Sequence, residues 1–203
     1  MVNLKKTVVE KGKKMDLLLH ICCAPCSLFS WQALQEKGYN IYGYFFNPNI
    51  HPYMEFSKRK EALRLLAQQE GKTIFIDERY LLEDYLRQVA EVAHDVEKRC
   101  PLCYQIRLEE TARQASEKGL KSISTTLLIS PYQKHELLRD VGEKIAQKYG
   151  LQFVYEDLRP GFRESMRLAR EKDLYRQGYC GCIYSEKERY YLKSQKSANQ
   201  KKR

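Results

Sequence analysis

The sequence predicts an α/β fold, in which a single domain is built on a mostly parallel sheet with helices on both faces. Short apolar runs alternate along the chain with longer segments whose apolar residues recur at helical spacing, and glycines or Asn-Pro pairs separate them. At 203 residues, the chain is long enough for one hydrophobic core and too short for two comfortable ones. Strands that alternate with helices form parallel sheets covered on both faces.

The first half of the chain contains three predicted strands and the helices between them. A short buried strand opens this half, and the helix after it is closed by Gly38. The second strand stops at the loop signal Asn47-Pro48-Asn49, and the third ends on Asp77. The predicted strands span residues 17–21, 41–46 and 73–76, and the predicted helices span residues 27–37 and about 53–70.

The second half continues the alternation of helices and strands. Pro101 predicts the start of a helix that Gly119 closes, because proline favours the first helical turn. Cys100 would then be the N-cap, and the helix dipole would lower the pKa of Cys100 and Cys103. The other predicted elements are helices within residues 81–92 and 137–145 and strands over residues 121–124 and 152–155.

The net charge of +10 comes from the two ends of the chain, because residues 1–14 contribute +4 and residues 187–203 contribute +6. We therefore divide the chain into a basic N-terminal extension (1–14), a single catalytic domain (15–190) and a basic C-terminal tail (191–203). Basic tails suit a protein that binds nucleic-acid phosphates, and the 15 tyrosines favour this because their rings can stack on bases. Tails that only keep the protein soluble remain the alternative.

The composition also bears on the compartment. No stretch reaches the length of an apolar membrane span, and the Lys-rich start is not followed by the cleavage site of a signal peptide. Seven thiols in a chain without an export signal are expected in a reducing environment. The sequence therefore predicts a cytoplasmic protein with no membrane partner.

All seven cysteines fall into three tight groups: Cys22-Cys23-Ala24-Pro25-Cys26, Cys100-Pro101-Leu102-Cys103 and Cys180-Gly181-Cys182. Clustered thiolates can share a soft metal centre, whereas structural cysteines usually occur singly. Ligands of open parallel sheets bind beyond the carboxyl ends of the strands, where the first group and Asp77 are expected. The glycine of the third group lets its two thiols approach each other, as a reducible disulfide or as ligands.

Three hypotheses explain these cysteines. A structural zinc would need only the four cysteines of the second and third groups. A dithiol oxidoreductase would use Cys23-Ala24-Pro25-Cys26 between a strand and a helix, but it leaves the other groups unexplained. An iron–sulfur cluster beside a separate redox pair in the third group accounts for nearly all seven thiols. The ligands of that cluster would be Cys22, Cys23, Cys100 and Cys103.

Several motifs resemble, in order, the cobalamin-independent epoxyqueuosine reductase family over roughly residues 16–190. They are His20-Ile21-Cys22-Cys23-Ala24-Pro25-Cys26-Ser27, Asn47-Pro48-Asn49-Ile50-His51-Pro52, Arg99-Cys100-Pro101-Leu102-Cys103-Tyr104, Thr125-Thr126-Leu127-Leu128-Ile129-Ser130-Pro131-Tyr132 and Tyr175-Arg176-Gln177-Gly178-Tyr179-Cys180-Gly181-Cys182. The resemblance implies an oxidoreductase of queuosine biosynthesis, which reduces epoxyqueuosine to queuosine at the wobble position of tRNAs with a GUN anticodon. It also implies a fold of the adenine-nucleotide alpha-hydrolase-like (HUP) group.

The resemblance further implies which residues carry the chemistry. The four cysteines named above would ligate a [4Fe-4S] cluster, and Cys180 with Cys182 would form a redox-active disulfide. The reduction takes two electrons and two protons, and the sequence does not identify the external electron donor. No Gly-x-Gly-x-x-Gly fingerprint of a flavin or nicotinamide site is present, so a bound inorganic carrier is expected to supply electrons.

We also expect a second, mononuclear iron at Cys26 and Asp77, where a Lewis acid would hold the epoxide oxygen. Asp77 fits a helix cap equally well. His20 is expected to be a hydrogen-bonded core histidine or a proton donor, and His51 a loop former. The hydroxyls after the fourth strand suit either ribose and phosphate or turn formation. These hydroxyls belong to Thr125, Thr126 and Ser130.

Two other functions remain as alternatives. An iron–sulfur tRNA thiolation enzyme would share the fold type and the cysteines, but it would need a Ser-Gly-Gly-x-Asp-Ser type ATP loop, which does not follow the first strand. A zinc-stabilised RNA-binding module would need no catalytic residues, and metal analysis separates it from the reductase.

Overall fold

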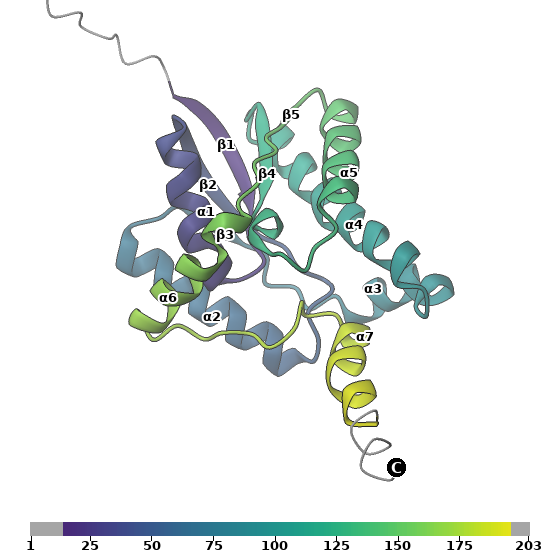
Figure 1. Ribbon diagram of the computed structural model, residues 1–203. Coiled ribbons are helices and arrows are strands. Elements are labelled where there is room, and N and C mark those ends of the chain that lie inside the picture. The colour runs from purple at the N-terminus through teal and green to yellow at the C-terminus, as the bar shows by residue number, and fades with distance from the viewer. Residues whose placement is uncertain (1–13, 196–203) are drawn as a thin grey trace, which may run out of the picture.

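The structure is a computed structural model that describes residues 14–195, and Figure 1 traces it from the purple N-terminal strand to the yellow C-terminal helix. The predicted tails lie mostly outside the described residues. The described part contains one five-stranded sheet of order β3-β2-β1-β4-β5, in which every pair of neighbours is parallel. The predicted parallel α/β fold is confirmed.

The strands lie within a few residues of their predicted positions. The central strand β1 pairs with β2 on one side and with β4 on the other, and its Leu17, Leu18 and Leu19 are completely buried. The bounds are β1 Met15–His20, β2 Tyr39–Phe45, β3 Ile74–Ile76, β4 Ser122–Thr125 and β5 Gln152–Phe153.

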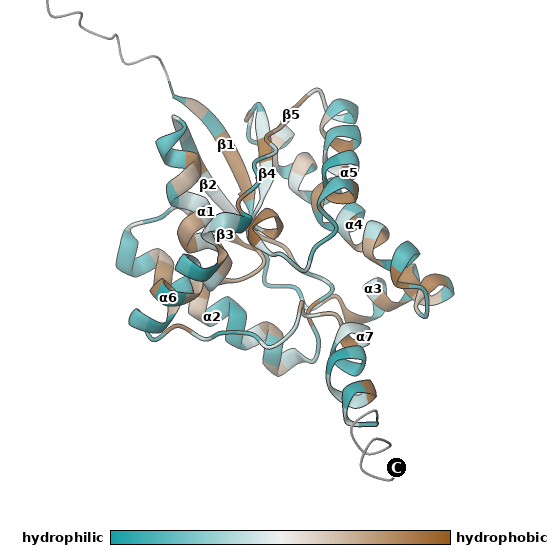
Figure 2. Ribbon diagram, viewed as in Figure 1, coloured by the Kyte–Doolittle hydropathy of each residue, from teal (hydrophilic) through white to brown (hydrophobic). Residues whose placement is uncertain are grey.

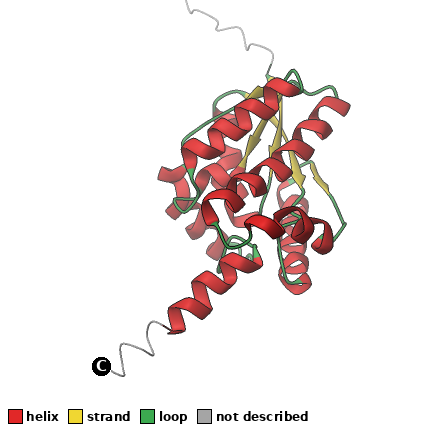
Figure 3. Ribbon diagram, turned by 90° about the vertical axis from the view of Figure 1, so that its right-hand side faces the viewer, coloured by secondary structure: helices red, strands yellow, loops and turns green. Residues whose placement is uncertain are grey.

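Helices cover both sides of the sheet (Figure 3). Successive side chains of β1 face opposite sides, so that Leu19 packs with Phe56 of α2, whereas Leu18 packs in a second cluster with Leu108 of α4. The apolar clusters show that α1, α2 and α6 share one face of the sheet, while α4 and α5 share the other. Figure 2 shows apolar residues along much of β1 at the centre of these layers. The helices are α1 Ala24–Glu36, α2 Tyr53–Glu70, α3 Leu82–Val89, α4 Val96–Glu117, α5 His135–Lys148, α6 Phe162–Glu171 and α7 Ile183–Glu186.

The predicted start of α4 at Pro101 is wrong. The helix begins at Val96, and its N-cap is Asp95, whose side chain accepts a hydrogen bond from the backbone N–H of Glu97. Pro101 lies inside the helix, where its missing N–H forfeits one bond to the preceding turn. Cys100 is therefore a helical residue rather than an N-cap, and it does not face the free backbone N–H groups of the helix end.

Two further differences concern element boundaries. Helix α1 begins at Ala24, so Cys26 lies in its first turn rather than in the loop before it. The sequence did not predict α6, α7 or the π-helical turn at Lys187–Tyr191. These elements are short, and α6, whose ten residues include five charged ones, buries only the small side chains Ser165 and Ala169.

None of the helices in the described residues combines the length and the apolar composition of a membrane span.

Gly142 of α5 provides a test of the packing between α5 and β5. A Cβ at this position would lie 2.5 Å from the ring of Phe153. Overpacking of this kind costs roughly 1–3 kcal/mol, and alanine returns about 1 kcal/mol in helix propensity. We therefore expect Gly142→Ala to lower the free energy of unfolding in urea by up to about 2 kcal/mol. Gln147→Ala, on the exposed face of α5, is the control. Stabilisation by Gly142→Ala would contradict the packing.

Candidate metal centre

The first cysteine group lies at the carboxyl end of the central strand β1. The Sγ atoms of Cys22, Cys23 and Cys26 all lie within 4.8 Å of one another, and the three side chains are buried. Cys23 is the N-cap of α1, and Pro25 lies in the first turn. The strand end and the helix start thus bring three thiols to one point, with the spacing that a thiolate-bound metal needs.

Polar groups from two distant segments contact these sulfurs. The Thr126 hydroxyl lies 3.4 Å from Cys22 Sγ and accepts a hydrogen bond from the Cys22 backbone N–H. Gln177 Nε2 donates to Cys23 Sγ at 2.8 Å and lies 3.8 Å from Cys26 Sγ. Hydrogen bonds from Cys23, Cys26 and Thr126 lower the pKa of Cys22. The triad therefore favours the thiolate form of Cys22.

The other four cysteines gather around α4 and the loop before α7. Cys103 and Cys182 pack in one buried cluster with Tyr85, whose hydroxyl lies 3.7 Å from Cys182 Sγ. Burial and the nearby Cys103 and Cys180 raise the pKa of Cys100 to about 11. Burial likewise raises the pKa of Cys103. The sequence predicted that an N-cap position would lower the pKa of Cys100 and Cys103. This prediction is wrong, because burial raises both pKa values and the end of the helix does not act on these thiols.

Arg107 lies between the two cysteine groups. Its side chain is buried, and its Nε donates to the carbonyl oxygen of Cys103, one helical turn earlier in α4. Within residues 14–195 the guanidinium has no carboxylate partner. Although burial opposes its charge, Cys103, Cys22 and Cys180 together raise the pKa of Arg107. A buried cation without a carboxylate needs negative charge from another source, and the thiols of Cys103, Cys22 and Cys180 are the ionisable groups near it.

The Cys180-Gly181-Cys182 loop is fixed to α2 by a buried arginine. Arg59 donates from Nη1 to the carbonyl oxygen of Cys180 at 3.1 Å and from Nη2 to that of Tyr179 at 3.0 Å. The same guanidinium pairs with Glu55 at 2.7 Å, and Tyr175 donates to the second carboxylate oxygen of Glu55. In Figure 1 the segment after α6 passes close to α2 on its way to α7, which agrees with these contacts.

Gly181 adopts a backbone conformation that only glycine takes readily. Its φ angle is +110°, and a Cβ would lie 2.8 Å from Ile50 Cγ1. Its carbonyl oxygen accepts a hydrogen bond from the His51 N–H at 2.8 Å. Cys180 is exposed and Cys182 is buried, and both are free thiols in this structure. The predicted disulfide between them stays a prediction.

Comparison with known proteins identifies the family. The family description "Epoxyqueuosine reductase QueH" matches residues 17–188. The chain belongs to the epoxyqueuosine reductase QueH family. A relative named epoxyqueuosine reductase QueH in Dehalococcoides mccartyi is 41% identical over 174 residues, which cover 86% of this chain and 94% of the relative. A relative of the same name in Thermotoga maritima is 35% identical and covers 85% of this chain and 91% of its own length.

A solved structure supports the fold assignment. The predicted subunit of a tRNA methyltransferase from Methanocaldococcus jannaschii matches with a TM-score of 0.51 over 77% of this chain and 75% of that chain. At 15% identity this likeness bears on the fold alone, and it agrees with the predicted HUP-like architecture. The QueH family name describes a reductase, so the chain is a member of a family of oxidoreductases.

The donor set fits the iron–sulfur cluster that the QueH resemblance implies. A cluster with four thiolate ligands carries net negative charge, which is what the unpaired Arg107 requires. Cys26, rather than Cys100 or Cys103, is the third member of the compact sulfur group. The assignment of Cys100 and Cys103 as the remaining ligands stays a prediction, which the place of Cys103 beside Arg107 supports.

Asp77 is engaged by another side chain. Its carboxylate accepts hydrogen bonds from both the backbone and the guanidinium of Arg79, and it is not part of the sulfur group. Although burial opposes its charge, the bonds from Arg79 lower the pKa of Asp77. The helix cap that the sequence offered as the alternative is wrong, because α3 begins only at Leu82 and its N-cap is Leu81. A second iron at Cys26 and Asp77 stays a prediction, and it would require Arg79 to move aside.

His20 has the role of a core histidine. Its Nδ1 lies 2.8 Å from the Thr125 hydroxyl and its Nε2 lies 3.2 Å from the carbonyl oxygen of Phe46. Burial lowers its pKa to about 3, so the ring is neutral at pH 7. The hydroxyls of Thr125 and Ser130 accept backbone N–H bonds within their own turns, and they serve turn formation.

Sequence reasoning missed several residues of the site. Arg59 and Gln177 gave no signal because only the fold brings them to their partners. Arg107 was missed as well, although it bonds Cys103 within α4. The spacing of Arg107 one turn after Cys103 was the only available hint. His51 is buried, and neither ring nitrogen has a partner among the described residues.

We expect Arg59→Met to destabilise the protein strongly, because it frees two loop carbonyls and leaves Glu55 buried without its cation. Breaking a buried ion pair costs roughly 3–5 kcal/mol, which urea unfolding would measure. The amide of His51, which bonds Gly181, should also exchange hydrogen faster. Arg64→Met on the same helix removes more exposed ion pairs to Glu61 and Glu78 and should cost under about 1 kcal/mol. Equal losses in the two variants would contradict the anchoring role.

Proposed function

We propose that this protein reduces epoxyqueuosine to queuosine in tRNA, at the wobble position of a GUN anticodon. The observation that carries the proposal is the place of the buried Cys22 and Cys103 thiols near Arg107 at the carboxyl edge of the sheet, in a chain of the QueH family. Such a site combines electron-rich sulfur ligands with a fixed positive charge. The alternative of an iron–sulfur tRNA thiolation enzyme would need an ATP-binding loop after β1, and the sequence has none there.

The reaction removes the epoxide oxygen as water and leaves an alkene, which consumes two electrons and two protons. A [4Fe-4S] cluster, when bound, supplies electrons in single steps. Cys22, Cys23, Cys100 and Cys103 would hold it. Gln177, which donates a hydrogen bond to Cys23, would orient that sulfur and stabilise negative charge on it.

The third cysteine group can balance the reaction. Oxidation of Cys180 and Cys182 to a disulfide releases two electrons and two protons, which is what the epoxide consumes. The raised pKa of Cys182, caused by burial and by Cys180, keeps its proton in place at neutral pH. An external electron donor would then reduce the disulfide again. Asp77 and Cys26 would hold a mononuclear iron, which would supply a Lewis acid to the site.

Arg107 would stabilise the negative charge that develops in this site. Its guanidinium is buried and held in place by Cys103, so it needs no reorganisation when charge appears nearby. The proposal places the reaction in the cytoplasm, because seven free thiols suit a reducing compartment. Both basic tails would add attraction for tRNA phosphates.

Metal analysis and nucleoside analysis test the proposal together. Protein purified without oxygen should be brown, with about four iron and four sulfide per chain. With a chemical reductant it should convert epoxyqueuosine in tRNA to queuosine, as mass spectrometry of the digested tRNA would detect. Iron beyond four would support the second site. Colourless protein with stoichiometric zinc and no conversion would contradict the proposal and favour the zinc-stabilised module. In that module, Cys103 and Cys182, which pack in one cluster, would be zinc ligands.

Serine substitutions separate cluster ligands from the redox pair. Cys100→Ser or Cys103→Ser replaces a soft ligand by a harder one, so the cluster and turnover should be lost together. Cys180→Ser should keep the visible absorption and lose turnover. Cys26→Ser decides between two roles, because loss of the whole cluster would make Cys26 a cluster ligand, whereas loss of one iron would fit the mononuclear site. Retention of the cluster in the Cys100 and Cys103 variants would overturn their assignment.

A further inference from the structure

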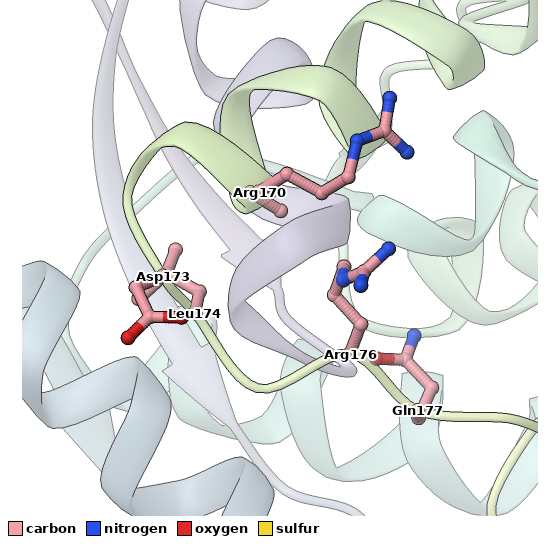
Figure 4. Close-up of a pocket in the computed structure, with 6 residues that line it drawn as sticks. Arg170, Asp173, Leu174, Arg176 and Gln177 are labelled. Carbon is pink, nitrogen blue, oxygen red and sulfur yellow. The ribbon is translucent and has the colours of Figure 1, made fainter.

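A polar pocket opens next to the sulfur triad, on the segment that follows α6. Its volume is about 650 Å³, and it is lined by Ala169, Arg170, Asp173, Leu174, Arg176 and Gln177. Figure 4 shows the side chains of Arg170 and Arg176 extending to the same side of this segment, with the amide of Gln177 beside Arg176 and with Asp173 away from both guanidinium groups.

The two guanidinium groups have no partner within the described residues. Neither the Arg170 side chain nor the Arg176 side chain makes an ion pair or a hydrogen bond there. The contrast with Arg167 of the same helix is clear, because Arg167 pairs with Glu164 at 2.6 Å and also with Glu171. The chain carries 36 basic and 26 acidic residues, and exposed arginines commonly find a carboxylate. Two arginines free in one pocket therefore offer their donors to a ligand.

Gln177 connects this pocket to the thiols. Its Nε2 donates to Cys23 Sγ at 2.8 Å, while its Oε1 is buried and has no hydrogen-bond partner in the described part of the chain. One side chain thus separates a ligand in the pocket from the sulfur atoms. An unpartnered buried acceptor is costly, and a ligand with an N–H or O–H group would satisfy it.

We propose that this pocket binds the RNA backbone next to the wobble nucleotide, with Arg170 and Arg176 as ligands of its phosphodiester groups. This inference rests on the proposed function. Guanidinium groups bind phosphate oxygens through paired hydrogen bonds, and they remain charged at every physiological pH. An enzyme that acts on one base takes that base out of the stack and leaves the phosphates outside, so phosphate ligands belong at the edge of the buried site.

The test removes the two charges and measures RNA binding. Arg170→Gln/Arg176→Gln is compared with the unmodified chain in a salt titration, with an anticodon stem-loop RNA as the ligand. Each lost phosphate contact in single-stranded RNA reduces the slope of log affinity against log salt by about 0.7. Two lost contacts should reduce it by about 1.4, which is roughly 25-fold weaker binding at 0.1 M salt if the lines meet near 1 M.

A charge-matched control separates a local contact from general attraction. Lys121→Gln/Lys144→Gln also removes two exposed, unpaired charges, at the amino edge of β4 and on α5. This control should keep the slope of the unmodified chain. Equal slopes for the pocket variant and the unmodified chain, or equal losses in both variants, would overturn the proposal. Because binding needs no turnover, failure of the proposed reaction itself would show separately, as absence of product from the unmodified chain.

Chemically altered RNA locates the contacted phosphates. A stem-loop with neutral methylphosphonate links on both sides of the wobble nucleotide should bind the unmodified chain as weakly as natural RNA binds the pocket variant. Combining the two changes should add no further loss, since they remove the same contact. Additive losses would place the contacts elsewhere on the RNA and overturn the assignment. The pocket variant could instead keep the salt slope of RNA binding but be reduced more slowly than the unmodified chain by a ferredoxin, and equally fast by dithionite. That result would overturn the RNA assignment and assign the pocket to an electron-donor protein.

Discussion

The buried charge of Arg107 constrains the whole carboxyl edge of the sheet. A guanidinium removed from water without a carboxylate partner is costly by several kcal/mol, and the structure places thiols of three cysteine groups around it. Those thiols, or a metal centre that they hold, have to supply the compensating charge. The charged form of this arginine and the ionised form of the cysteines therefore depend on one another.

The fold meets this constraint by bringing residues from both faces of the sheet to one end. Arg59 comes from α2 on one face and Arg107 from α4 on the other, while the first cysteine group follows the central strand. The two arginines differ in function because Arg59 already has Glu55 as its counterion. Its remaining donors hold the backbone of the late cysteine loop, whereas the charge of Arg107 stays available to the site.

The alternation of strands and helices along the chain could be predicted from the sequence, and the three cysteine groups could be recognised there, because both depend on local spacing. Gly38 and Gly119, with positive φ, close two helices as expected. The error at Cys100 has a physical cause: proline is tolerated beyond the first turn when one lost hydrogen bond is the only cost, and Asp95 is the better cap. Gln177 and Arg59 were out of reach, since their partners lie more than 100 residues away in sequence.

The distribution of charge separates attraction of RNA from its recognition. The body between the basic ends is neutral in sum, so long-range attraction has to come from those ends. At about 0.1 M salt, such attraction fades beyond roughly 10 Å. Inside that distance, the unpaired Arg170 and Arg176 lie beside Gln177, which touches Cys23. Charge can thus hold any RNA backbone at the edge of the site, but it cannot distinguish one nucleotide from another. Under the proposed function, discrimination of the epoxide would then fall to the buried thiols and Arg107.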